Sequence, residues 1–326
     1  MWDSHQRQFT YLRLSITDAC NFRCVYCLPQ GYNPGNKKKP IPPLSLREIT
    51  HLVTAFAELG MSKIRITGGE PTLRRDLPAI VRAIAALPGV QKVALSTNGY
   101  RLQSILPVLR HAGLTHLNVS IDSLDPRRFA KLTGKNLLPE VLAGIEVALA
   151  TGFAQVKVNA VLLQEWDEQE FHFFEDWVRQ RPVLVRFIEL MPTRQNGFLQ
   201  DGRRLSGAEM QTQLLNRGWF RQARKEGDGP AVEYRHPDFV GGFGIIAPYS
   251  PGFCSTCNRL RITSQGELRL CLFAEGNHSV RHLLQEAAQK DALQELLQNL
   301  LQKKESSHYL PLGRLGDTQT FSAMGG

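Results

Sequence analysis

The stretch YLRLSITDACNFRCVYC, residues 11–27, joins an alternating strand pattern to three closely spaced cysteines. Residues two apart on a strand face the same side. The polar side chains of this strand therefore share one face and the apolar ones the other: Arg13, Ser15 and Thr17 against Leu12, Leu14 and Ile16. The pattern predicts a sheet with a polar face, and the cysteines stand in the loop that follows the strand.

Strand-like and helix-like segments alternate through the first two-thirds of the chain. The predicted strands are Tyr11–Thr17, Lys63–Thr67, Lys92–Ser96, His116–Asp122, Val156–Val161 and Val183–Leu190. The predicted helices are Leu46–Leu59, Leu73–Leu87, Gln103–His111, Pro139–Ala150 and Asp167–Gln180. This alternation is typical of a parallel sheet covered by helices, either doubly wound or a barrel.

Polar residues on the later strands favour the barrel. Shared faces recur in three groups: Lys63, Arg65 and Thr67; Asn118, Ser120 and Asp122; Lys157 and Asn159. Parallel strands buried on both faces would be almost continuously hydrophobic, and a closed eight-stranded barrel fills its interior with branched apolar side chains. We therefore predict an incomplete (β/α)6 TIM-like barrel with a wet lumen, open on one side. Antiparallel strands with one solvated face are the alternative, because they give the same alternation.

The pattern changes after about Ser206, where short strands are separated by Gly and Pro. Strands are expected at Ala231–Arg235, Phe243–Ile246 and Leu260–Thr263, and helices near Val280–Ala288 and Ala292–Lys303. We expect an α+β region that closes the open side of the barrel. The predicted division is 1–205 for the barrel and 206–326 for the C-terminal region.

Composition and charge leave the function open. Hydrophobic residues make up 42% and charged residues 21% of the 326, which is ordinary for a soluble globular protein. The net charge of +9 suits a nucleic acid, a small polyanionic substrate or simply a basic surface. The start of the chain lacks the pattern of a secretion signal, and no apolar run is long enough to span a bilayer. The cytosol is the expected compartment.

All six cysteines fall into two groups, the first triad (Cys20, Cys24 and Cys27) and the second triad (Cys254, Cys257 and Cys271). In a reducing cytosol, metal ligation explains such groups better than disulfides. The first triad has the spacing CxxxCxxC. Three thiolates can hold three corners of a four-iron cluster and leave one iron open to a small molecule such as S-adenosylmethionine (SAM). A zinc site or buried structural thiols are the alternatives, although structural zinc prefers four ligands.

The second triad reads CxxC, then thirteen residues, then Cys271. One interpretation is a zinc knuckle with His236 or His278 as the fourth ligand. The other is a second three-cysteine cluster, again with one free iron. The spacing by itself leaves both open.

The motifs resemble those of known enzymes. CxxxCxxC with Tyr26 before its last cysteine is the radical SAM signature, and Gly68-Gly69-Glu70-Pro71 resembles the GGE motif of that superfamily. Along nearly its whole length the chain resembles the GTP 3′,8-cyclase family (molybdenum cofactor biosynthesis protein A). The matching stretches are Leu12–Cys27, Lys63–Leu73, Ser96–Gly99, Val119–Leu124, Lys157–Val161, Arg186–Pro192, Pro251–Thr263 and Arg269–Phe273. The final Gly325-Gly326 also matches the family.

This resemblance implies two [4Fe-4S] clusters, one on each triad, with SAM on the first and the guanine ring of GTP on the open iron of the second. The implied SAM contacts are Tyr26, Gly69, Glu70, Ser120 and Met191. The implied GTP contacts are Arg13, Arg65, Ser96, Lys157, Arg186, Arg259, Leu260 and Arg261. The implied catalytic positions are Arg259, Arg261, Gly325 and Gly326.

The resemblance further implies a lyase that converts GTP to (8S)-3′,8-cyclo-7,8-dihydroguanosine 5′-triphosphate, in the first step of molybdenum cofactor biosynthesis. A 5′-deoxyadenosyl radical from SAM would take the hydrogen of C3′, and C3′ would then attack C8. A flavodoxin or ferredoxin would supply electrons, and cyclic pyranopterin monophosphate synthase would receive the product. A monomer or homodimer is expected, without nucleic-acid or membrane partners.

Three positions depart from the family pattern: Ala19 where many members carry Arg, Ser96 where Thr is usual, and Met324 where Ile is common. None of them removes a cluster ligand or a phosphate-binding cation. Two other functions fit the same motifs. A different radical SAM enzyme with an auxiliary cluster, such as a peptide maturase, would fail to bind GTP. A zinc-dependent nucleic-acid-binding protein would contain zinc and no acid-labile sulfide.

Overall fold

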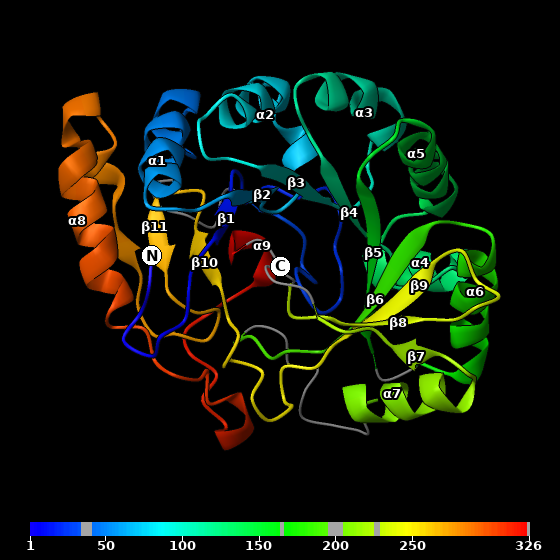
Figure 1. Cartoon of the computed structure of the whole chain (residues 1–326). Helices are drawn as coiled ribbons and strands as arrows, with labels where there is room; N and C mark the ends of the chain where they lie inside the picture. Colours follow the sequence, from blue (N-terminus) through cyan, green and yellow to red (C-terminus); the bar gives the residue numbers. More distant parts are fainter. Residues whose placement is uncertain (34–40, 164–165, 195–204, 225–228, 325–326) are drawn as a thin grey trace.

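A computed structural model describes residues 1–33, 41–163, 166–194, 205–224 and 229–324. In these residues one twelve-stranded sheet has the order β12-β11-β10-β1-β2-β3-β4-β5-β6-β9-β8-β7 (Figure 1). Its six central strands run parallel: β1 (Tyr11–Ser15), β2 (Lys63–Thr67), β3 (Lys92–Thr97), β4 (His116–Ser120), β5 (Gln155–Leu162) and β6 (Val183–Glu189). Within the described part of the chain, no helix combines the length and apolar character needed to cross a membrane.

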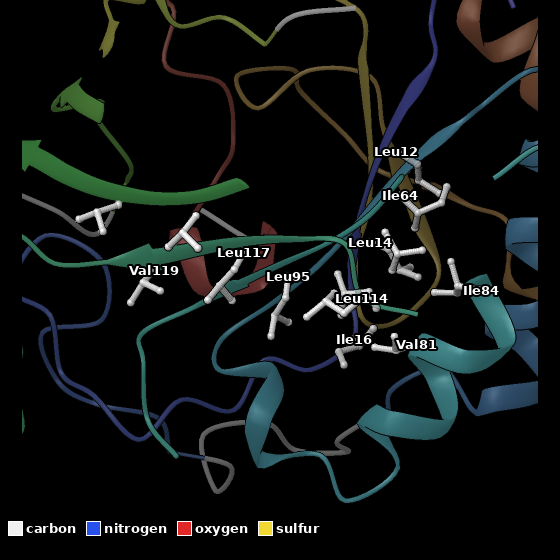
Figure 2. Close-up of a cluster of buried hydrophobic side chains, with 14 of the residues drawn as sticks. Leu12, Leu14, Ile16, Ile64, Val81, Ile84, Leu95, Leu114, Leu117 and Val119 are labelled. Carbon is white, nitrogen blue, oxygen red and sulfur yellow. The ribbon is translucent and has the colours of Figure 1, made fainter. Parts of the chain in front are cut away.

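Helices cover the convex side of this sheet, as Figure 1 shows. They are α1 (Leu46–Glu58), α2 (Leu77–Ala85), α3 (Leu102–His111), α4 (Pro126–Thr133), α5 (Leu138–Ala150) and α6 (Glu168–Arg179). Leu12, Leu14 and Ile64 of the strands are fully buried beside Val81 and Ile84 of α2 (Figure 2). Burying side chains of this size contributes roughly 1.5–3 kcal/mol each. The apolar strand face is thereby used for the core, and the polar face is left for the concave side.

The sheet extends at both edges with strands from the C-terminal region. β9 (Gly242–Ile246) pairs parallel to β6, and β8 (Val232–Arg235) and β7 (Phe220–Arg221) follow it. β10 (Arg259–Ile262) pairs parallel to β1, and β11 (Glu267–Arg269) and β12 (His278–Ser279) follow that. The predicted incomplete (β/α)6 barrel with an added C-terminal α+β region is confirmed.

Three elements complete the C-terminal region: α7 (Gly207–Asn216), α8 (Lys290–Leu301) and the short α9 (Phe321–Met324). α9 lies inside the curve of the sheet in Figure 1, while α8 lies outside it beside α1. The C-terminal region therefore contributes strands to both edges of the barrel and a helix to its concave side.

Some boundaries differ from the sequence predictions. The predicted helix Val280–Ala288 is wrong, because the structure has two separate 3-10 turns, Arg281–Leu283 and Ala287–Gln289. The predicted helix Leu73–Leu87 begins only at Leu77, after a 3-10 turn at Pro71–Leu73. α4 and α7 were not predicted, although Asp125 before Pro126 and Ser206 before Glu209 are N-capping patterns.

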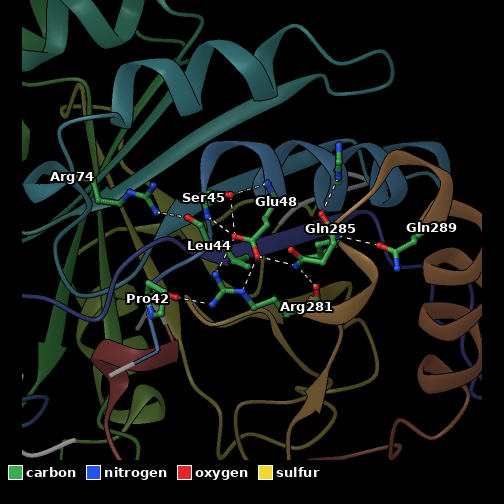
Figure 3. Close-up of polar contacts among 10 residues, drawn as sticks. Pro42, Leu44, Ser45, Glu48, Arg74, Arg281, Gln285 and Gln289 are labelled. Atoms are coloured by element: carbon green, nitrogen blue, oxygen red, sulfur yellow. Dashed lines mark hydrogen bonds and ion pairs between the residues drawn. The ribbon is translucent and has the colours of Figure 1, made fainter. Parts of the chain in front are cut away.

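A polar network fastens the C-terminal region to α1 (Figure 3). Ser45 and Glu48 form a capping box at the start of the helix. Arg281 then donates to both carboxylate oxygens of Glu48, at 2.7 and 3.0 Å, and to the Pro42 carbonyl at 2.7 Å. Because one guanidinium binds both Glu48 of α1 and the loop before the helix, Arg281 docks this segment against the barrel.

Candidate active site

A cavity on the concave side of the sheet collects residues from β1 to β6, β10, the cysteine loop and α9. At the carboxyl ends of the strands it is lined by the first triad, Gly68, Gly69, Ser120, Asp122 and Met191. Away from these ends, along the middle and the amino-terminal half of each strand, the cavity is lined by positively charged side chains and their polar neighbours. The cavity thus has a sulfur-containing end and a basic end.

The first triad lies in a tight turn at one end of the cavity. The amide of Cys27 donates to the Cys24 carbonyl at 3.0 Å, and the Asn98 side-chain amide lies 3.9 Å from the Cys20 sulfur. Burial raises the pKa of the Cys24 thiol, and Asp122, Cys27 and Cys20 raise it further. Burial also raises the pKa of Cys27, to about 12. Three partly buried thiols whose pKa values are raised fit a positively charged partner such as an iron cluster, which binds them as thiolates.

The Gly68-Gly69 turn packs directly against this cysteine loop. Gly69 donates to the Thr17 carbonyl at 2.8 Å, and Glu70 donates to the Ala19 carbonyl at 2.7 Å. A Cβ on Gly69 would collide with the Ala19 backbone, and Gly68 has a φ of +143°. Only glycines allow this approach of the two loops. The contacts of Ala19 are made by its backbone, so the small side chain leaves them intact.

The Glu70 carboxylate does not line the cavity. It is fully buried and accepts hydrogen bonds from the Thr72 amide, the Thr97 hydroxyl and the Asn98 amide, at 3.0, 2.7 and 2.6 Å. Burial raises the pKa of Glu70, and these bonds oppose that rise. In this structure Glu70 holds the β2 and β3 loops together.

Among the residues that the structure describes, seven lysines and arginines line the cavity: Arg13, Lys63, Arg65, Lys157, Arg186, Arg259 and Arg261. Their strands are in register. Arg261, Arg13 and Arg65 form one row across β10, β1 and β2, and Arg259, Tyr11 and Lys63 form the next. Side chains that are paired on neighbouring strands lie close together on the same face.

Burial lowers the pKa of five of these cations, and neighbouring positive charges add to the effect. Burial lowers the pKa of Arg13 to about 10, with Arg65 and Arg259 adding to the effect. Burial and Arg65 lower the pKa of Arg186 to about 9, and burial and Arg186 lower that of Lys157 to about 8. Like charges gathered in a buried space are stabilised by a polyanion, so the basic end is chemically suited to one.

Some of these cations have partners within the protein. Arg65 donates to the Ser96 hydroxyl at 3.2 Å. Lys157 pairs with Glu233 at 3.1 Å, and Arg186 donates to Asn159 at 2.6 and 3.0 Å. These contacts hold the side chains in the cavity.

The second triad lies at the β10–β11 pair. Arg261 is opposite Arg269 in this antiparallel pair. Cys257 precedes β10 by two residues and Cys271 follows β11 by two, so both cysteines stand at the same end of the pair. Burial raises the pKa of Cys257, but Arg259, Lys304 and Arg7 outweigh it and lower the value to about 7. A thiol that cations hold near its thiolate form fits a metal-binding role.

The zinc-knuckle histidines have other neighbours. The His236 ring packs against Trp219 and Phe239, at 5.4 and 4.9 Å between centroids. His278 pairs with Leu268 in the β11–β12 ladder. Among the residues that the structure describes, no group of three His, Cys, Asp or Glu is placed to hold a single metal ion.

Most of the residues singled out from the sequence meet in this cavity. Tyr26, Gly69, Ser120, Met191, Arg13, Arg65, Ser96, Lys157, Arg186, Arg259 and Arg261 line it together with the first triad. Leu260 points into the core and is fully buried, and the second triad lies beside the lining of the cavity. Gly325 and Gly326 lie outside the described residues.

Several residues that line the cavity were not among the predicted ligand contacts, and Tyr11, Lys63 and Asp122 are examples. Tyr11 lies two residues before Arg13, Lys63 two before Arg65, and Asp122 two after Ser120. The two-residue spacing along each strand was therefore the sequence signal that could have identified them as lining residues. Asp122 accepts a hydrogen bond from the Tyr26 hydroxyl at 2.9 Å and so fixes the aromatic ring beside the triad.

Comparisons with known proteins agree with this geometry. The Radical SAM superfamily pattern matches residues 14–178, and the pattern described as Molybdenum Cofactor Synthesis C matches residues 183–310. GTP 3′,8-cyclase of Aeromonas hydrophila is 49% identical over 326 residues, covering 99% of this chain and 95% of that protein. The enzyme of the same name from Haemophilus influenzae is 46% identical, covering 99% of this chain and 96% of that protein.

Solved structures share the fold. Streptococcus suis SuiB has a TM-score of 0.61 at 12% identity, covering 89% of this chain and 69% of that one. Methylornithine synthase (PylB) has a TM-score of 0.51 at 17% identity, covering 64% of this chain and 62% of that one. At such low identity these similarities establish the architecture alone.

Proposed function

The chain belongs to the GTP 3′,8-cyclase family of radical SAM enzymes, and from this membership we propose how its cavity divides the work. It is a lyase that converts GTP to (8S)-3′,8-cyclo-7,8-dihydroguanosine 5′-triphosphate, in the first step of molybdenum cofactor biosynthesis. SAM and a [4Fe-4S] cluster are the cofactors that the superfamily implies.

The sulfur-containing end is proposed to hold SAM. Cys20, Cys24 and Cys27 would bind the cluster, and SAM would contact Tyr26, Gly69, Ser120 and Met191, with Glu70 holding the loops. When bound there, and with one electron from an external reductant, the cluster and SAM would supply the radical chemistry that begins at C3′ of GTP. The protein orients the two ligands and excludes water from the radical.

The basic end is proposed to hold the triphosphate. The observation that carries this proposal is the register that aligns Arg261, Arg13 and Arg65 across three strands. A triphosphate carries about four negative charges, and guanidinium groups bind phosphate oxygens in a fork geometry. Ser96, Lys157, Arg186, Arg259 and the Leu260 backbone complete the proposed contacts.

The second triad is proposed to hold a second [4Fe-4S] cluster, with the guanine ring at its open iron. Its position supports this, because Cys257 and Cys271 flank the strand pair that carries Arg259 and Arg261. A base bound beside β10 would leave its phosphates within reach of these two arginines.

The remaining proposals concern partners and organisation. A flavodoxin or ferredoxin in the cytosol would supply electrons, and cyclic pyranopterin monophosphate synthase would consume the product. The enzyme would act as a monomer or homodimer. The division into residues 1–205 and 206–326 stays a prediction.

A deuterium-transfer experiment tests the proposed chemistry. The anaerobically reconstituted enzyme is given SAM, a reductant and GTP deuterated at C3′, and 5′-deoxyadenosine is analysed by mass spectrometry. We expect about one deuterium per molecule of 5′-deoxyadenosine, because the radical takes the hydrogen directly. A control with GTP deuterated at C8 should transfer none. Unlabelled 5′-deoxyadenosine from the C3′-deuterated substrate contradicts the proposal.

A further inference from the structure

The short helix α9 fills the space between the two triads. Phe321 and Met324 are buried, and they form an apolar cluster with Leu272, Phe273 and Leu310. Five partly buried neighbours pack against this cluster, among them Tyr26 and Cys27 from the first triad loop and Cys271 from the second triad. One helical turn near the end of the chain therefore links the surroundings of both triads.

α9 also lies beside the first triad. Phe321 belongs to the apolar cluster against which Cys27 packs, and Phe321 and Ser322 line the cavity together with Cys27. This packing requires a particular position of the helix, because side chains are in contact only when their heavy atoms approach within about 4.0–4.5 Å. Something outside the four residues of α9 must hold that position.

The chain entering α9 is fastened at Asp317 and Thr318. Arg269 donates to the Asp317 carboxylate, and also to the Thr318 hydroxyl at 2.8 Å. Asp317 additionally accepts from the Gly276 amide at 2.8 Å, and the Thr318 carbonyl accepts from the Arg194 amide at 3.0 Å. The Arg269 side chain is only 3% exposed, so its pairing with Asp317 is a largely desolvated contact.

This fastening point is close to α9 along the chain. Only Gln319 and Thr320 separate Thr318 from Phe321. The three Cα–Cα steps from Thr318 to Phe321 span at most about 11 Å, so a fixed Thr318 limits how far α9 can move. Arg269 belongs to β11, pairs in register with Arg261, and precedes Cys271 by two residues. Arg269, which holds the segment before α9, is thus part of the β10–β11 pair beside the second triad.

We propose that Arg269 is a positioning residue, which holds Asp317 and Thr318 so that α9 stays packed beside Cys27 and Cys271. The effect on turnover rests on the proposed function, whereas the effect on the position of α9 does not. Arg269 acts through Asp317 and Thr318 and does not line the cavity. Loss of this anchor releases α9 from its position beside Cys27 while the phosphate-binding cations stay in place.

Hydrogen–deuterium exchange tests the anchor in the cluster-free and the reconstituted protein. Two variants each remove one partner of the ion pair: Arg269→Gln removes the buried partner, and Asp317→Asn removes the more exposed one. We expect amide exchange in the peptide containing Phe321 and Ser322 to accelerate about tenfold or more in both variants, because the helix opens locally. Exchange in β1 and β2 should match the wild type, which shows that the barrel stays folded.

The matched control is Arg314→Gln. Arg314 pairs with Glu305 at 3.1 Å in the same C-terminal segment, but both side chains are about half exposed, so exchange in α9 should not change. In the reconstituted enzyme, Asp317→Asn should lower kcat about tenfold, with KM for GTP within about twofold of wild type, and Arg314→Gln should change neither. Wild-type exchange of α9 in both anchor variants would overturn the proposal. The exchange result decides it even if the wild type fails to cyclise GTP.

Discussion

Arg13 on β1 lies in register with Arg261 on β10, so two guanidinium groups from opposite ends of the sequence share one row of the sheet. Arg65 continues the row on β2. Burial lowers the pKa of Arg261 well below its usual value, and Arg13 and Arg259 lower it further. This row of like charges therefore destabilises the empty protein, and a bound polyanion offsets the repulsion.

Replacing Arg261 or Arg259 with Ala should weaken GTP binding, because hydrogen bonds to charged groups contribute roughly 1.5–3 kcal/mol each. The unliganded Arg261→Ala protein should be no less stable than the wild type, since one member of a repulsive row is gone. Equilibrium dialysis and urea unfolding measure the two effects. The control is Arg127→Ala, an exposed cation on α4, and GTP affinities equal to that control would refute the phosphate site.

Tyr11 should make GTP binding depend on pH. Burial alone raises the pKa of its phenol, but Arg65, Arg13 and Lys63 outweigh burial and bring it to about 6. Arg259 faces it from β10. Above pH 6 the phenol of the empty cavity is ionised, and a neighbouring triphosphate favours the protonated form. Binding then takes up a proton, so affinity should fall as pH rises.

The matched variant for this effect is Tyr11→Phe. It retains the ring but has no group to ionise, so its profile reports only the ionisation of GTP and of the remaining protein. Between pH 6.5 and 8.5 the wild-type affinity should fall by up to about tenfold per pH unit relative to the variant. Parallel profiles for the two proteins would show that Tyr11 does not ionise in the cavity.

The Glu48–Arg281 pair should contribute to stability in a pH-dependent way. Burial raises the pKa of Glu48, but hydrogen bonds from Arg281 and Ser45 outweigh it and hold the value at about 2, below its usual 4.5. The contribution is therefore present above pH 4.5 and is lost as pH falls toward 2. In cluster-free protein at pH 7, Glu48→Gln should lower the free energy of unfolding by roughly 1.5–3 kcal/mol.

Urea unfolding of the cluster-free protein at several pH values measures this contribution. The wild type and Glu48→Gln should converge as pH falls below about 4. Glu58→Gln is the control, because Glu58 pairs with Lys290 at the surface and exposed pairs contribute little. A constant difference between Glu48→Gln and the wild type from pH 7 to pH 3 would show that the effect comes from packing.

Gly325 and Gly326 lie outside the residues that the structure describes, and we expect turnover to depend on them. Deleting both residues should preserve iron content and GTP affinity but nearly eliminate GTP-dependent formation of 5′-deoxyadenosine. The reason is that residues without side chains pass through gaps where larger ones would clash. Adding a short peptide with both glycines should restore part of the activity. Normal turnover by the deletion variant would assign the glycines to a frayed terminus.

The sequence predicts much of this site because strand alternation is a local property. Arg13, Arg65 and Lys157 could be assigned to a polar lumen from their two-residue spacing alone. The pairing of β10 with β1 could not be predicted in this way, because nothing near Arg261 indicates a partner so distant in the sequence. Val280–Ala288 has a helical pattern, yet Arg281 binds Glu48 instead. Tertiary contacts overrode local preference there.

The two triads provide the most direct test of the account, because each is assigned a separate task. Cys24→Ala and Cys271→Ala are purified anaerobically, reconstituted, and analysed for iron, 5′-deoxyadenosine and cyclised GTP. Each variant should contain about four irons where the wild type contains about eight. Cys24→Ala should cleave no SAM, whereas Cys271→Ala should retain the SAM-binding cluster and form no cyclised product. Cyclisation by Cys271→Ala at the wild-type rate would contradict the account.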